Sequence, residues 1–275
     1  MSILIVCIYV DDLIFTGNSE VQIMSFKESM KKEFEMTDLG LMHYFLGIQV
    51  SQSEHEVTLS QGKYAQDLLK RFNMANSAEL STPAEYGITA HKDTTGQDVE
   101  ANIFRSLVGS LMYLCATRPD ITYSVSLISK YMEKPKRSHW EMAKRILRYI
   151  KGTLNQGLIY KRNETFMLQG YCDSNYGGDP DDGRSTGGYM FKMGDSIISW
   201  QSKKQNVVAL SSTEAEYMAL CAAGCQALWL RGILDQLLQK QMKSCPRDQE
   251  ADILTKALQV GRFRELKIKA GVGNV

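Results

Sequence analysis

The chain has 275 residues, 44% hydrophobic and 23% charged, which allows two packed domains and excludes a disordered chain. Its net charge of +1 predicts no polyanionic partner by itself, and no segment reaches the ~18 apolar residues that a membrane span requires. We therefore expect an intracellular protein without a membrane partner, in a compartment that no targeting signal specifies.

The first predicted elements are two strands joined by a tight turn. Residues 3–10 form an apolar, β-prone run, Asp11 and Asp12 interrupt it, and residues 13–15 resume it. Because the chain begins directly on a core strand, we expect Met1 to lie inside a larger ancestral domain.

The middle of the chain is predicted to be mainly helical. Its elements are, in chain order, a helix capped by Ser19, a hairpin over 46–59, a helix over 62–72, a polar linker over 81–97 and helices over 103–151 that Pro119 interrupts. Proline is tolerated in the first turn of a helix, so a new helix is expected to begin at the interruption.

From residue 168 the pattern changes to short strands. Three antiparallel strands are predicted over 168–171, 188–192 and 197–200, followed by helices over 213–238 and 248–258. The six cysteines form no CxxC pair, which is typical of reduced thiols. Cys221 and Cys225 are four residues apart on the long helix, and we interpret them as core residues rather than as a metal site.

Two adjacent carboxylates, Asp11 and Asp12, stand at the end of the first strand. Neighbouring strand residues point to opposite faces, so a turn is needed to aim one carboxylate into a cleft. Carboxylate oxygens are ligands that magnesium prefers. A plain hairpin turn explains Tyr9 to Asp12 equally well when these four residues are taken alone.

Residues 130–151 contain eight basic and two acidic side chains, a net charge of +6. The residues that we expect to contact phosphates are Lys134, Lys136, Arg137, Lys144, Arg145, Arg148 and Lys151. A solvated helix face is the alternative interpretation. His139, a single histidine in this basic helix, is expected to lie on the surface or to face phosphate.

Seven sequence blocks support a more specific interpretation. They are YVDDLIFTGNS, FEMTDLGLMHYFLGIQV, GKYAQDLLKRFNM, RSLVGSLMYLCATRPDITYSVSLIS, YCDSNYGGDPDDGRSTGGYMF, SWQSKKQNVVALSSTEAEYMAL and EADILTKAL. In this order, and over nearly the whole chain, they resemble the C-terminal part of copia-type LTR retrotransposon Pol polyproteins. A collinear series of blocks is more specific than any single motif.

The resemblance implies an α/β fold in which a reverse transcriptase palm, thumb and connection remnant precedes an incomplete ribonuclease H-like mixed sheet with flanking helices. Residues 1–80 would be the end of the palm and a thumb-like region. Residues 81–160 would be a linker and helical connection, and residues 161–275 a ribonuclease H-like domain.

The resemblance also implies two metal sites. Asp173, Glu216 and Asp252 would hold Mg²⁺ or Mn²⁺ in the ribonuclease H part, whereas Asp11, with Asp12 beside it, would be a relic of the polymerase metal site. A further polymerase aspartate of the family has no counterpart here, so we expect no polymerase activity. Glu214 would lie about 200° around the helix from Glu216 and is interpreted as a first-turn acid that complements the helix dipole.

The sequence departs from the family pattern between Gln239 and Ser244. Several tens of residues, including a strand with another catalytic aspartate, are missing there, either through a real deletion near Gln241 or through an incorrect gene model. Loss of one ligand should weaken metal binding and turnover, and loss of the strand should expose an apolar edge beside Asp173.

We therefore expect a retrotransposon-derived fragment whose ancestral activities are RNA-directed DNA synthesis and hydrolysis of RNA in RNA–DNA hybrids. Its ribonuclease H activity should be weak or absent, and its partner would be an RNA–DNA hybrid or another nucleic acid duplex. The alternatives are a non-catalytic nucleic-acid-binding remnant and a decaying transposon copy whose product does not accumulate.

Overall fold

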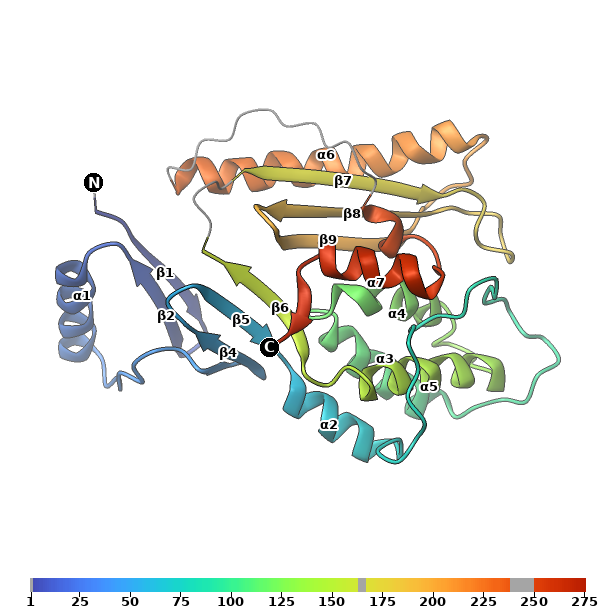
Figure 1. Ribbon diagram of the computed structural model, residues 1–275, viewed down its shortest axis with the longest axis horizontal. Coiled ribbons are helices and arrows are strands. Elements are labelled where there is room, and N and C mark those ends of the chain that lie inside the picture. The colour runs from blue at the N-terminus through green and yellow to red at the C-terminus, as the bar shows by residue number, and fades with distance from the viewer. Residues whose placement is uncertain (1, 163–166, 238–249) are drawn as a thin grey trace. The chain divides into compact units, whose positions relative to one another are not determined.

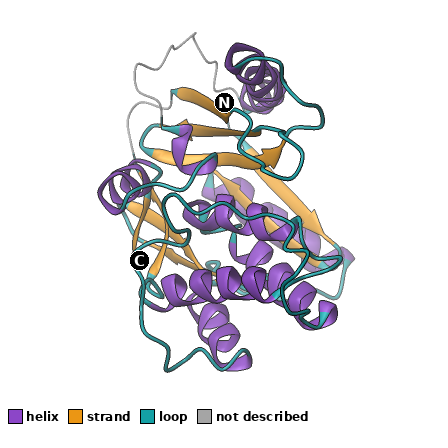
Figure 2. Ribbon diagram, turned by 90° about the vertical axis from the view of Figure 1, so that its right-hand side faces the viewer, coloured by secondary structure: helices purple, strands orange, loops and turns teal. Residues whose placement is uncertain are grey.

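The computed structural model describes residues 2–162, 167–237 and 250–275. It combines helices with several antiparallel sheets, which confirms the α/β class (Figures 1 and 2). The chain divides into two compact units, Met1–Met42 and His43–Val275. The domain boundaries near residues 80 and 160 stay a prediction.

The first unit contains β1 (Leu4–Tyr9), β2 (Asp12–Gly17) and α1 (Glu20–Glu33). The strands are antiparallel and joined by a tight turn, as the sequence predicted, and their register places Tyr9 opposite Asp12, so the turn itself is Val10–Asp11. The Ser19 hydroxyl caps α1 by accepting a hydrogen bond from the backbone N–H of Gln22 at 3.5 Å. Between residues 2 and 42, no described residue is buried.

The helices of the second unit are α2 (Gly62–Arg71), α3 (Ala101–Leu114), α4 (Thr122–Ser129) and α5 (Arg137–Lys151), with the short 3₁₀ helix η1 (Pro119–Ile121) before α4. The predicted interruption at Pro119 is therefore confirmed. Phe104, Leu107 and Leu147 are fully buried where these helices pack, because their apolar positions recur at helical spacing. Between α2 and α3, residues 73–100 form a long loop, which we term the strap.

An antiparallel sheet of five strands joins distant parts of the chain. Its strands, in spatial order, are β10 (Val272–Asn274), β6 (Gln156–Lys161), β5 (Glu56–Ser60), β4 (Ile48–Gln52) and β3 (Tyr44–Phe45). The β4–β5 hairpin was predicted, whereas β6 and β10 were not. Leu158 on β6 and Val272 on β10 are paired and buried, so the last residues complete this sheet.

The second sheet is a three-stranded meander with α6 across one face (Figure 1). Its elements are β7 (Leu168–Asn175), β8 (Thr186–Met193), β9 (Ser196–Lys204) and α6 (Ser212–Gln236). Tyr189 and Phe191 pack against Ala223 and Leu230 of α6, whereas Met190 lies in the main core with the helices. This alternation is expected for a strand buried on both faces, and the predicted meander and helix are confirmed.

The C-terminal segment differs from the prediction. Over 250–258, the described part of the helix predicted over 248–258, the structure has the four-residue 3₁₀ helix η2 (Ala251–Leu254), and α7 (Val260–Lys269) follows it. The short turn buries Ile253 and Leu254 in the main core, which a continuous surface helix would not do. The predicted deletion at 239–244 lies outside the described residues, among which β7 pairs with β8 alone.

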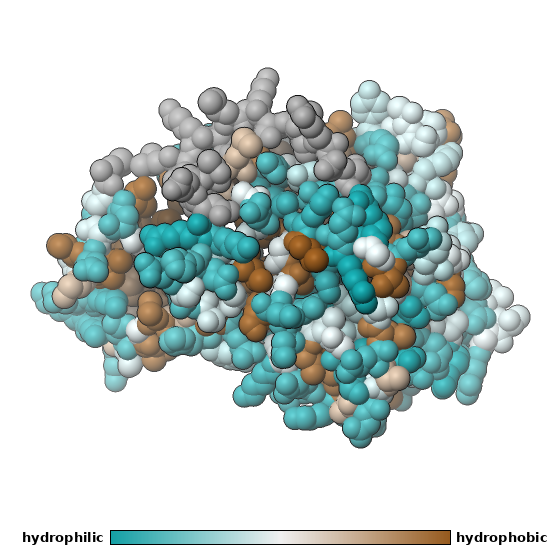
Figure 3. All heavy atoms as spheres, in the orientation of Figure 1, coloured by the Kyte–Doolittle hydropathy of each residue, from teal (hydrophilic) through white to brown (hydrophobic). Residues whose placement is uncertain are grey.

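Exposed apolar side chains are scattered over the surface, and on the face drawn in Figure 3 they form separate patches among hydrophilic residues. Cys221 and Cys225 are exposed on α6, so their assignment to the core was wrong. The reason is that α6 contacts the sheet through another stripe, formed by Ala215, Ala219 and Ala223. By length and composition, α6 is also the one described helix that could cross a membrane, although its alanine stripe packs on the meander.

Candidate active site

Asp173 and Asp252 are brought together at the junction of β7 and η2. Asp173 is buried on β7, and its Oδ2 accepts a hydrogen bond from the Thr255 hydroxyl. Lys256 lies between the two acids, with its Nζ 3.3 Å from Asp173 Oδ2 and 2.8 Å from Asp252 Oδ1. Two residues that directly follow η2 therefore connect the meander to η2, which carries Asp252.

Gly188 makes this close approach possible. It lies opposite Asp173 in the β7–β8 register. A Cβ atom at residue 188 would lie 2.8 Å from Thr255 Cγ2 and 2.9 Å from Leu254 Cβ. Because glycine has no Cβ, η2 can pack directly on β8 and place Thr255 and Lys256 beside Asp173.

Glu216 belongs to the same electrostatic environment. Burial raises the pKa of this carboxyl, and the negative charge of Asp173 raises it further, although a hydrogen bond from the backbone of Ser174 acts in the opposite direction. Asp252 and Lys256 also act on Glu216. The acids predicted from the sequence thus influence one another across β7, α6 and η2.

Glu214 has a different role, as expected for a first-turn acid. One of its carboxylate oxygens accepts a hydrogen bond from the backbone N–H of Leu210 at 2.6 Å. Its own backbone N–H donates to the hydroxyl of Ser211, the residue that caps α6, at 3.1 Å. These contacts satisfy backbone groups at the start of the helix and take Glu214 away from the Asp173 site.

The oxygen donors of Asp173, Glu216 and Asp252 have the chemistry that Mg²⁺ and Mn²⁺ prefer. Their present arrangement does not form such a centre: among the described residues, no group of three or more potential ligands is placed to hold a metal ion. Lys256 instead bridges two of the carboxylates. Burial disfavours its ammonium form, but Asp252 and Asp173 outweigh this effect and raise the pKa of Lys256.

Asp11 and Asp12 lie apart from these residues in the chain, at the β1–β2 turn of the first unit. They line a pocket of about 300 Å³ together with Phe15, Lys27 and other residues of the same unit. Val10, which precedes them, has φ of 52°, a left-handed conformation that is unfavourable for a β-branched residue. Such strain is common where a turn positions functional side chains.

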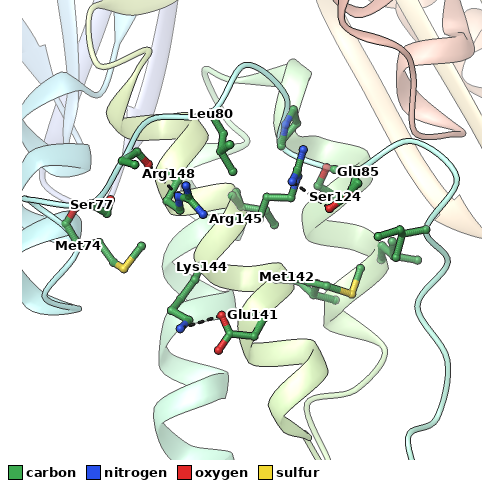
Figure 4. A pocket seen from close by; sticks show the side chains of 17 residues that line it. Met74, Ser77, Leu80, Glu85, Ser124, Glu141, Met142, Lys144, Arg145 and Arg148 are labelled. Carbon is green, nitrogen blue, oxygen red and sulfur yellow. Dashed lines mark hydrogen bonds and ion pairs between the residues drawn. The ribbon is translucent and has the colours of Figure 1, made fainter.

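The basic side chains near the end of α5 hold the strap (Figure 4). Arg148 Nε donates to the carbonyl of Ala78 at 2.8 Å, and Lys151 Nζ donates to the carbonyl of Ser77 at 2.5 Å. Arg145 donates to the Thr82 hydroxyl and pairs with Glu85, both at 3.1 Å. These side chains would have to exchange strap contacts for phosphate contacts in order to bind a duplex.

Of the other four predicted phosphate-contacting residues, three form ion pairs within the protein and one is exposed. Lys136 is buried and pairs with Asp98 at 2.8 Å. Arg137 and Lys144 both pair with Glu141, at 2.9 and 2.8 Å. Lys134 is exposed. Most basic side chains of residues 134–151 therefore form contacts within the protein in this structure.

His139 does not lie on the surface, so that prediction was wrong. It is buried, and its ring stacks on Tyr131 with 3.9 Å between the ring centroids. Its Nδ1 accepts from the backbone N–H of Lys136, and its Nε2 lies 3.0 Å from the carbonyl of His91, which assigns the ring proton to Nε2. One of these contacts, the carbonyl of His91, comes from the strap, which is distant in sequence, so the sequence alone did not indicate that His139 is buried.

Comparison with known proteins identifies the family. The family model "Reverse transcriptase (RNA-dependent DNA polymerase)" matches residues 1–86. The chain is 39% identical to the Pol polyprotein from transposon RE2 of Arabidopsis thaliana over 86% of its own length, and 39% identical to that from transposon TNT 1-94 of Nicotiana tabacum over 85%. It is also 38% identical to the uncharacterized mitochondrial protein AtMg00810 of Arabidopsis thaliana, covering 92% of that protein.

The chain belongs to the copia-type retrotransposon Pol family. It spans only 16% of the RE2 polyprotein and 18% of the TNT 1-94 polyprotein. No solved structure matches the chain.

Three residues of this Pol chain that lie at the Asp173 site were missed by the sequence interpretation. They are Gly188, Thr255 and Lys256. The spacing of Thr255 and Lys256, three and four residues after Asp252, was a usable signal, because these residues would share one face of a helical turn with it. The role of Gly188 had no local signal, since it depends on η2, more than sixty residues later.

Proposed function

We propose that residues 161–275 form a ribonuclease H-like domain that hydrolyses the RNA strand of RNA–DNA hybrids with low turnover. The observation that carries this proposal is the grouping of Asp173, Glu216 and Asp252, from β7, α6 and η2, around one shared electrostatic environment. A group of carboxylates that includes one with a perturbed pKa, here the raised pKa of Glu216, is typical of catalytic sites.

The chemistry requires several carboxylates because water must attack a phosphodiester that is already negatively charged. A divalent ion, Mg²⁺ or Mn²⁺, would lower the pKa of a bound water and stabilise the oxygens of the reacting phosphate. In this chain, Thr255 orients Asp173 by donating to it, and Lys256 offsets part of the negative charge. The low turnover follows from the expected loss of a further ligand between Gln239 and Ser244.

Residues 1–80 are proposed to be the end of a reverse transcriptase palm and a thumb-like region, and residues 81–160 a helical connection. In the first, Asp11 and Asp12 are proposed to be relics of the polymerase metal site.

The test is cleavage of an RNA–DNA hybrid, labelled on the RNA strand, by purified chain with Mg²⁺ or Mn²⁺. We expect slow cleavage of the hybrid and none of the corresponding DNA duplex, and we expect Asp173→Asn to abolish it. Asp195→Asn is the matched control, because Asp195 is an exposed aspartate in the β8–β9 turn of the same meander. Equal cleavage by wild type and Asp173→Asn would indicate a contaminating nuclease.

Hybrid binding without cleavage by folded protein would overturn the proposed hydrolysis and favour a non-catalytic binding remnant. Such binding should weaken steeply with salt if phosphate contacts provide it. The third possibility, a decaying copy without a folded product, predicts that the purified chain shows no cooperative unfolding in urea.

A further inference from the structure

Lys256 occupies the position between two carboxylates that come from different elements. Its ammonium lies 2.8 Å from Asp252 Oδ1 and 3.3 Å from Asp173 Oδ2. The exposed fraction of the Lys256 side chain is 39%, compared with 9% for Asp173 and 20% for Asp252. The lysine therefore reaches the acids from the solvent side, on a flexible stem.

The groups around Lys256 carry more negative than positive charge. Asp173 and Asp252 interact electrostatically with Lys256, and both acids and Lys256 interact with Glu216. A second cation, Arg262, lies 3.9 Å from Asp252. The Thr255 hydroxyl neutralises no charge, although it donates to the same Asp173 oxygen as Lys256. Three acids are thus incompletely balanced by one lysine and one more distant arginine.

An ammonium group and a divalent cation that bridge these two carboxylates would bind to the same carboxylate oxygens. Each needs negatively charged oxygens within a few ångströms, and both cannot use the same oxygen positions at once. A buried pair of carboxylates without any cation would repel each other, since Coulomb energy grows as the surroundings become less polar. The lysine removes this repulsion in the metal-free protein.

We propose that Lys256 is a built-in counter-cation that holds Asp173 and Asp252 together and competes with divalent metal ions for their oxygens. The inference rests on the proposed function only in taking this site as the metal-binding one. Metal binding would displace the Lys256 ammonium from both carboxylates into solvent, while Thr255 and Gly188 keep the backbone of η2 in place. The competition keeps the affinity for divalent ions low.

The experiment is a calorimetric titration of the full-length chain with Mn²⁺. Lys256→Met keeps the length of the side chain but removes its charge, and it should bind Mn²⁺ at least about tenfold more tightly than wild type. Lys63→Met is the matched control, because Lys63 is an exposed lysine of α2 that forms no ion pair within the described part of the chain, and it should bind as wild type does. Equal or weaker binding by Lys256→Met overturns the proposal.

A second measurement observes the wild-type lysine itself, and a variant serves only to assign its signal. After reductive methylation with ¹³C-formaldehyde, the Lys256 signal, assigned by its absence from Lys256→Arg, should shift on addition of Mg²⁺ or diamagnetic Zn²⁺. The same signal unmoved at saturating metal overturns the proposal.

A double-mutant cycle that combines Lys256→Met with Asp173→Asn tests whether the competition takes place at Asp173. The gain in Mn²⁺ affinity from Lys256→Met should shrink severalfold in the Asp173→Asn background, because the competed oxygen pair is already disrupted. An undiminished gain would place the competition elsewhere and overturn the proposal. Tight Mn²⁺ binding without hybrid cleavage would refute the proposed ribonuclease activity while leaving the lysine competition intact.

Discussion

Replacement of Asp120 by alanine should destabilise the second unit strongly. Asp120 and Arg118 form a bidentate ion pair with N–O distances of 2.8 and 2.9 Å, and their side chains are 0% and 4% exposed. The Tyr149 hydroxyl donates to Asp120 at 2.5 Å, and Lys267 of α7 donates to that hydroxyl at 3.2 Å. One carboxylate therefore connects η1, α5 and α7.

The expected magnitude follows from what alanine would leave behind. Arg118 would remain buried without its anion, which typically costs about 3–5 kcal/mol of unfolding free energy. For a unit of this size, each kcal/mol corresponds to about 2–4 °C, so the melting temperature should fall by about 6–20 °C. Asp120→Asn keeps the shape but removes the charge, and it should give a smaller loss.

The assay is urea unfolding followed by tryptophan fluorescence, for which the chain has three tryptophans. Asp67→Ala is the control, because its ion pair with Lys70 is 3.6 Å long and 61% exposed on the aspartate side. This exposed pair should contribute under about 0.5 kcal/mol. A decrease of less than about 1 kcal/mol in the unfolding free energy of Asp120→Ala would refute the argument that this buried pair holds η1, α5 and α7 together.

The pH dependence has a defined sign. Burial alone would raise the pKa of Asp120, but the charge and hydrogen bonds of Arg118 outweigh it and lower the pKa. A lowered folded-state pKa contributes stability above the unfolded value of about 3.9, and this contribution is lost as the pH falls below it. The wild type should therefore lose more stability on acidification than Asp120→Asn.

Three further predictions concern the site and its supports. Hydrogen bonds from lysines outweigh burial and lower the pKa of Asp179 to about 2. Its contribution to the free energy of unfolding should therefore be present above about pH 4 and lost as the pH falls toward 2. In urea unfolding at a series of pH values, the stability of Asp179→Asn should fall less steeply over this acid range than that of wild type. Gly188→Val should cost about 1–3 kcal/mol in urea unfolding, because η2 leaves no room for a side chain; an unchanged midpoint would contradict this. Arg148→Ala should make trypsin cleave the strap severalfold faster than in a Lys161→Ala control, and equal rates would show that the arginine does not hold it.

Much of the candidate site could be predicted from the sequence, because it depends on local order. The β1–β2 turn at Asp11 and the meander that carries Asp173 follow from short apolar runs and turn residues. The family resemblance selected Glu216, and helical geometry indicated that Glu214 could not share its role, with which the observed capping contact of Glu214 agrees. Family membership rested on collinear blocks, which also need no tertiary information.

The tertiary structure decided which residues meet. Pairing of β6 with β5 and β10, burial of His139, and attachment of the strap to Arg148 all depend on contacts between residues distant in sequence. Local periodicity reports only which face of an element is apolar, not which partner covers it. Lys256 shows the same limit: its charge is visible in the sequence, but its position between Asp173 and Asp252 exists only because η2 packs against the glycine on β8.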